Sequence, residues 1–115
     1  MPLVKVQTNM ARDNIPKDFH DRMTKLLAEV MDKPEERISI TLETDKAMTR
    51  GASFDAYCEV HITAIGVESR EKTLPIVQKV TKFIAVQTGI ASHRIAIWIF
   101  SAQPHHIGVN GELMG

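Results

Sequence analysis

The sequence holds too few cysteines for a disulfide framework or a thiolate metal site. Cys58 is the single cysteine among 115 residues, so the chain can form no internal disulfide and offers no cysteine cluster for zinc. His105 and His106 are adjacent and would face opposite ways if their segment were extended, and the sequence offers no cluster of further ligands near them. We therefore expect no bound metal and no cofactor, and the lone thiol fits a reducing compartment.

The chain also lacks an excess of charge of either sign. Fourteen Lys and Arg balance fourteen Asp and Glu, so no broad basic field exists to bind nucleic acid or an anionic membrane surface. No apolar run approaches the roughly 20 residues that span a bilayer, and no charged and then apolar leader opens the chain. We expect a protein that is cytoplasmic, or secreted by a non-classical route, without nucleic-acid binding or membrane insertion.

What the sequence does contain is an internal repeat. A shift of 57 positions places Thr24–Ala28 over Thr81–Ala85 and Arg37–Ile40 over Arg94–Ile97 without a gap. The chain is too short for two independent cores, so we predict a single domain over residues 1–115, with repeats at about 2–45 and 57–101 and a tail at 102–115.

Each repeat has the pattern of a strand, a helix and a strand. Strands are predicted over residues 3–8, 38–42, 57–65 and 95–100, from alternating or continuous apolar residues. The first helix is expected to have Pro16 in its first turn and to stop at Asp32-Lys33-Pro34, and Gly89 fits the end of the second. Their apolar stripes are Phe19, Met23, Leu26, Leu27, Val30 and Met31 in the first, and Leu74, Val77, Val80, Phe83 and Ile84 in the second.

Two strand-helix-strand units predict an α+β fold. We expect a four-stranded mixed sheet with both helices on one face, followed by short C-terminal strands. The other face would then be uncovered, yet the segment 95–100 is apolar at nearly every position. Because such strands are typically buried on both sides, we predict ring-like self-association through this face.

Pro2 is the first candidate functional residue. Removal of Met1 would leave a secondary amine, and burial or a nearby cation lowers the pKa of an amine, so that it can act as a base near pH 7. If Met1 stays attached, the nitrogen of Pro2 is a tertiary amide, which is not basic. Considered alone, a proline after the initiator methionine is more often a consequence of N-terminal processing than a catalyst.

The surrounding sequence changes that interpretation. Over nearly its whole length the chain resembles the macrophage migration inhibitory factor and D-dopachrome tautomerase family, and its pattern is closer to divergent invertebrate or parasite-type members than to the vertebrate factor. The residues that carry the resemblance are Pro2, Thr8-Asn9, Lys33-Pro34, Met48, Gly51, Ala64-Ile65-Gly66 and Ile107-Gly108-Val109-Asn110-Gly111.

The resemblance implies a homotrimer around a central channel and keto–enol tautomerisation of phenylpyruvate-like or dopachrome-like substrates. In that family Pro2 would correspond to the catalytic base, Lys33 to a lysine that binds the substrate carboxylate, and Ile65 to a residue that lines the pocket. The family also implies cytokine-like signalling through a cell-surface receptor as a further partner.

The departures from the family pattern concern the pocket wall. Ala96 and Trp98 stand where the vertebrate factor has a tyrosine and an asparagine, which a neighbouring subunit supplies to the pocket. Arg37, Val109 and Met114 replace a tyrosine, a tryptophan and a phenylalanine. Arg37 adds a second cation for carboxylate binding, and Trp98 gives the pocket a different wall, so we expect weak or redirected activity.

Three functional classes stay open from the sequence. The first is a tautomerase, an isomerase that uses Pro2. The second is a secreted cytokine-like binding protein with little or no tautomerase activity. The third is an isomerase of the bacterial carboxymethyl-hydroxymuconate type, although Gly51-Ala52-Ser53 and the segment 107–111 favour the migration inhibitory factor branch.

Overall fold

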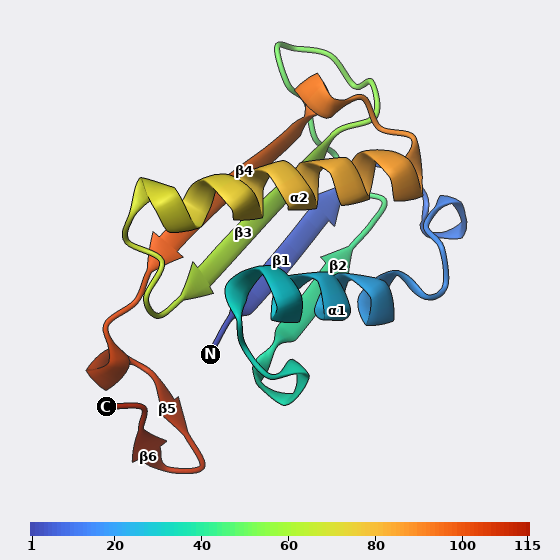
Figure 1. Ribbon diagram of the computed structural model, residues 1–115. Coiled ribbons are helices and arrows are strands. Elements are labelled where there is room, and N and C mark those ends of the chain that lie inside the picture. The colour runs from blue at the N-terminus through green and yellow to red at the C-terminus, as the bar shows by residue number, and fades with distance from the viewer.

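Four strands in the order β2-β1-β3-β4 form the sheet. The computed structural model describes residues 1–115, with β1 at Leu3–Thr8, β2 at Ser39–Glu43, β3 at Cys58–Ala64 and β4 at Ile95–Ser101. The outer pairs β1·β2 and β3·β4 are parallel, whereas β1 and β3 run antiparallel at the centre (Figure 1). This mixed sheet is the one that the repeat predicts.

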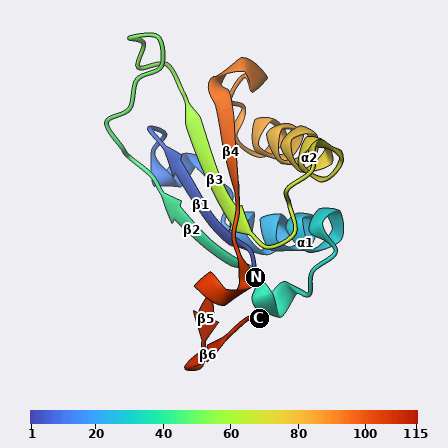
Figure 2. The same cartoon turned by 90° about the vertical axis from the view of Figure 1, so that its left-hand side faces the viewer.

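One helix connects each parallel pair. Helix α1 (Phe19–Met31) joins β1 to β2, and α2 (Arg70–Thr88) joins β3 to β4. Both helices lie on the same face of the sheet (Figure 2). Short 3-10 helices at Glu35–Arg37 and Ser92–Arg94 precede β2 and β4 at equivalent places. The predicted fold class is therefore confirmed, together with the strand-helix-strand composition of both repeats.

The helix boundaries follow the local sequence, with one correction. Helix α1 begins at Phe19, so Pro16 precedes the helix, and its carbonyl accepts a hydrogen bond of 3.1 Å from the Phe19 amide. Helix α1 ends at Asp32, which adopts the left-handed conformation with φ of 53°. The Ser69 side chain caps α2 by accepting from the Lys72 amide, and Gly89, with φ of 78°, ends it.

The core lies between the helices and the sheet. Strand β3 alternates strictly, burying Cys58, Val60, Ile62 and Ala64 against the helices. Helix α1 buries Phe19, Met23 and Leu27, as its stripe predicts. In α2 the prediction is wrong at its N-terminal end: Ile76 joins Val80 and Ile84 in the core, whereas Leu74 is 43% exposed. Two residues correspond to about 200° of helix rotation, which points Leu74 away from the sheet.

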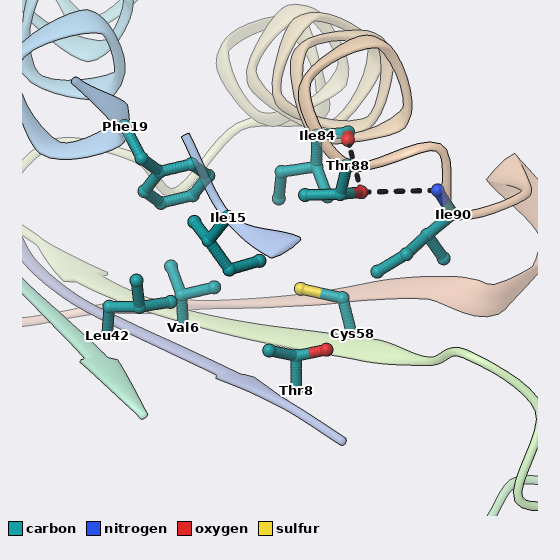
Figure 3. Close-up of a pocket in the computed structure, with 9 residues that line it drawn as sticks. All are labelled: Val6, Thr8, Ile15, Phe19, Leu42, Cys58, Ile84, Thr88 and Ile90. Carbon is teal, nitrogen blue, oxygen red and sulfur yellow. Dashed lines mark hydrogen bonds between the residues drawn. The ribbon is translucent and has the colours of Figure 1, made fainter. Parts of the chain in front are cut away.

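Cys58 lies beside a small interior gap of about 10 Å³ between the sheet and the helices. Figure 3 shows its thiol directed into this gap, among apolar side chains from both layers. On one side Thr88 donates to the Ile84 carbonyl and accepts from the Ile90 amide. A gap of this size holds no substrate, and burial raises the pKa of the Cys58 thiol to about 12.

The second face of the sheet carries no helix (Figure 2). We refer to it as the open face. It presents large apolar side chains to solvent: Leu3 is 59%, Trp98 42% and Phe100 52% exposed. The His61 ring stacks on the Trp98 ring, with centroids 5.3 Å apart and planes inclined by 9°.

No helix in the structure has the length and apolar content needed to cross a membrane.

A short hairpin ends the chain. Strands β5 (Gly108–Val109) and β6 (Glu112–Leu113) pair antiparallel, with Asn110 and Gly111 both at positive φ in the turn. The sequence predicted short C-terminal strands, and the structure adds their location: the hairpin lies near the beginning of the chain (Figure 2).

Candidate functional site

The sheet topology gathers the candidate residues at one end of the molecule. Because β1 and β2 are parallel, the beginning of the chain lies beside the segment that enters β2, and the Ser39 amide donates to the Pro2 carbonyl at 3.1 Å. Because β3 is antiparallel to β1, the C-terminal end of β3 lies at the same end of the sheet as the beginning of β1, with Thr63 opposite Leu3. The end of α1 and the 3-10 helix at Glu35–Arg37 lead into this edge as well.

Pro2 is buried at this end, and Met1 is half-buried. The α-amino group of Met1 has a pKa below its ordinary value, first because of burial and then because of the positive charges of Lys33 and Arg37. The two cations act on the beginning of the chain from two different segments, the turn after α1 and the 3-10 helix before β2. Arg37 also shares a hollow with Met1, whereas Lys33 lines a second hollow at this end of the molecule.

Two hollows open at this end. We call the first the tail hollow; it measures about 330 Å³ and is lined by Met1, Glu36, Arg37, Val109, Glu112, Leu113 and Met114. We call the second the helix hollow; it measures about 490 Å³ and is lined by Lys33 and Ile65 together with residues at the end of α1 and the beginning of α2.

The structure thus brings together some of the residues proposed from sequence and separates one. Arg37 shares a hollow with the chain terminus, and Lys33 shares the other with Ile65. Trp98 does not belong to this end: it pairs with His61 midway along the edge strand β4 and lies on the open face. A role for Trp98 in this site therefore requires the Trp98 of a neighbouring subunit, as the resemblance implies.

Sequence reasoning missed two carboxylates in the tail hollow. Glu36 and Glu112 both line it. Glu36 is next to Arg37 in the sequence, so its presence could have been inferred. Glu112 belongs to β6, and only the folding of the C-terminal hairpin back toward Met1 brings it there. No local sequence pattern specifies that return.

The family can be assigned from comparison of the sequence with known proteins. The family model described as macrophage migration inhibitory factor (MIF) matches residues 1–115. This chain belongs to the macrophage migration inhibitory factor family. Among curated members of the family, the MIF-like protein mif-2 of Caenorhabditis elegans is 32% identical over 111 residues, covering 96% of this chain and 92% of that protein. D-dopachrome decarboxylase-B of Xenopus laevis is 30% identical over 115 residues, covering 99% and 98%.

Solved structures of the family share the fold. The macrophage migration inhibitory factor of Trichinella spiralis superimposes with a TM-score of 0.92 at 20% identity, over 96% of this chain and 98% of that one. The homologue from Prochlorococcus marinus gives a TM-score of 0.89 at 24% identity, over 98% and 99%. The predicted similarity to this family, including invertebrate and parasite members, is therefore confirmed.

Proposed function

We propose that this protein is a keto–enol tautomerase for phenylpyruvate-type or dopachrome-type substrates, with the amine of Pro2 as its base once Met1 has been removed. One observation carries the proposal: Pro2 is buried at the end of the molecule where Arg37 lines a hollow with Met1, and the pKa of the Met1 amine there is lowered by burial and then by the charges of Lys33 and Arg37. Pro2 is one residue further inside than Met1 and is more buried. Its amine would experience the same effects and be neutral, hence basic, near pH 7.

The chemistry requires only the movement of protons. The neutral amine removes a proton from the carbon next to the substrate ketone, and the electron pair of that C–H bond forms the carbon–carbon double bond of the enol. The carbonyl oxygen gains a proton from water in the same conversion, and the amine afterwards releases to water the proton that it took. Lys33 would hold the substrate carboxylate by a charge-assisted hydrogen bond, and Ile65, in the same hollow, would pack against the substrate.

We also propose that the active form is a homotrimer. The apolar open face and the unpaired edges of β2 and β4 support self-association. In such an assembly Ala96 and Trp98 of a neighbouring subunit would complete the pocket. Ala96 has no polar group and the Trp98 indole can only donate, so the orientation of the substrate carbonyl would be weaker than with a tyrosine and an asparagine.

The deciding test is the conversion of 4-hydroxyphenylpyruvate by protein whose intact mass confirms the loss of Met1. We expect measurable activity that falls at least about 100-fold in Pro2→Gly, in line with the usual contribution of general base catalysis. Protein that retains Met1 is the matched control, because it keeps every side chain while converting the nitrogen to an amide, and it should be inactive. Equal rates in the three forms would refute the proposal.

A cytokine-like binding function is the second candidate, favoured by the loss of polar groups at Ala96 and Trp98. It predicts that binding to a cell-surface receptor survives in Pro2→Gly, whether or not tautomerisation is lost. A receptor-binding assay that compares the two proteins separates the functions, because a signal that disappears with Pro2 would tie binding to the amine itself.

A further inference from the structure

Arg37 and Arg94 occupy equivalent positions in the two repeats but differ in what they bind. Arg94 donates hydrogen bonds to the carbonyl groups of four residues in the loop before β3, at 2.9 to 3.3 Å: Arg50, Ser53, Asp55 and Ala56. The Arg37 amide donates to the Pro34 carbonyl at 3.1 Å, but the Arg37 side chain forms no hydrogen bond and no ion pair with its own chain. Its exposed guanidinium therefore has its hydrogen-bonding capacity unused, in the tail hollow beside the chain terminus.

Lys33 is unpaired as well. Its ammonium forms no ion pair and no hydrogen bond with the chain, and it lines the helix hollow with Ile65. The helix hollow also contains Asp32, Glu71 and Lys72. Lys33 and Arg37 thus line two separate hollows, and after burial their charges both lower the pKa of the Met1 amine. A ligand with a single carboxylate can satisfy only one of them, whereas a ligand with two can satisfy both.

We propose that Arg37 is a specificity-determining residue that directs this site towards substrates with two carboxylates: a 2-oxo acid with a second acidic group at its far end. The inference rests on the proposed function, because it places the reacting carbon at Pro2. Lys33 would bind the carboxylate next to the ketone, and the Arg37 guanidinium would bind the second one through two parallel hydrogen bonds.

Glu36 and Glu112 line the tail hollow too, and neither is paired with Arg37. They reduce the net positive charge that a second carboxylate meets. Recognition must therefore depend on the directed hydrogen bonds of the guanidinium. A lysine at position 37 would be a poor substitute, because it keeps the positive charge but lacks the two parallel N–H donors of a guanidinium.

The test uses a matched pair of unreactive ligands, so that binding is measured apart from catalysis. Cinnamate has one carboxylate, and 4-carboxycinnamate differs from it only by a second. Titration calorimetry with protein free of Met1 should show the dicarboxylate binding roughly tenfold more tightly, which is the scale of one charge-assisted hydrogen-bonded pair. In Arg37→Gln the preference should disappear, and in Arg37→Lys most of it should be lost.

Lys82→Gln is the matched control, because Lys82 is an exposed cation on the far side of α2 and its loss should leave the preference unchanged. Equal binding of the two ligands by the unmodified protein, or a preference that survives in Arg37→Gln, would overturn the inference. A failure of the proposed function looks different: the dicarboxylate preference would be present while 4-hydroxyphenylpyruvate is not converted.

Discussion

Cys58 shows how position decides the chemistry of a residue. Its side chain is buried at 2% exposure beside the interior gap, and burial together with the charge of Glu59 raises the pKa of the thiol to about 12. Because only the thiolate is a nucleophile, Cys58 acts as a small apolar core residue. Its place on the alternating strand β3 directs the thiol into the core.

A thiol reagent checks this. At pH 8 we expect native protein to react with an aromatic disulfide reagent at least 100-fold more slowly than protein unfolded in guanidinium, where the thiol regains an ordinary pKa near 8.5. The raised pKa also makes the stability of the fold depend on pH. Between about pH 9 and pH 12 the native state keeps the thiol proton, whereas the unfolded state loses it. The free energy of unfolding should therefore decrease as pH rises through this range. Rapid labelling of the native state at pH 8 would contradict the assignment.

Among the site residues, the sequence identified those whose place depends on the order of the strands. Lys33 and Arg37 follow α1 and precede β2, so a parallel β1·β2 pair is sufficient to bring them to Pro2. Glu112 could not be located in this way, because the path of a 14-residue tail depends on packing rather than on periodicity. The site roles of Pro2, Lys33, Ile65, Arg37 and Trp98 stay predictions.

At the scale of the element, the loop between β2 and β3 is held by side chains that belong to other segments. Arg94 binds four of its carbonyl groups, and the Asn9 side chain donates to the carbonyls of Phe54 and Asp55 while accepting from the Tyr57 amide. The guanidinium also lies 5.6 Å from the centre of the Tyr57 ring. A long connection thereby gains a defined shape although its only regular pairing is one isolated bridge between Arg50 and Ser53.

Replacement of Arg94 by lysine should destabilise the fold. A lysine keeps the charge but cannot donate to carbonyls spread over several residues, so we expect a loss of about 1–3 kcal/mol in the free energy of unfolding. Urea unfolding measures it. Arg70→Lys is the matched control, because Arg70 is exposed at the beginning of α2 and its side chain makes no hydrogen bond. An equal effect of the two substitutions would show that the loop contacts contribute nothing.

The elements themselves were predicted well because their signals are local. Periodicity predicts the order of strands and helices, Pro34 predicts the end of α1, and Gly89 predicts the end of α2. The errors at Pro16 and Leu74 have a common cause. Both residues lie in or before the first turns of a helix. The apolar pattern there does not specify how the preceding loop leads into the helix, and therefore not where the helix begins or which side chains of its first turns face the sheet.

At the scale of the whole molecule, the open face carries apolar side chains that a monomer cannot bury. Leu3, Trp98 and Phe100 are exposed on it together, and exposed groups of large apolar side chains usually mark an interface. We expect sedimentation at micromolar concentration to give a trimer. Trp98 is the single tryptophan, so its emission should shift to longer wavelength when the assembly dissociates.

A charged residue on this face should separate the subunits. Phe100→Glu is expected to yield monomers, because a carboxylate would be buried without a partner. Val86→Glu provides the control, since Val86 is 72% exposed on α2, on the other side of the molecule, and should leave assembly unchanged. A stable monomer of the unmodified protein would remove the trimer proposal while leaving the family and the fold in place.

The antiparallel pairing of β1 with β3, flanked by two parallel partners, relates the two repeats by an approximate twofold rotation. Under that rotation the entrance of β2 corresponds to the entrance of β4, and the beginning of the chain corresponds to the loop that leads into β3. In the second repeat, backbone oxygens of that loop surround Arg94. In the first repeat Arg37 lines the tail hollow beside Met1, and its side chain forms no hydrogen bond with the chain. The chain thus supplies the oxygen acceptors for Arg94 itself, whereas an acceptor for the side chain of Arg37, at the position related by the rotation, has to come from another molecule.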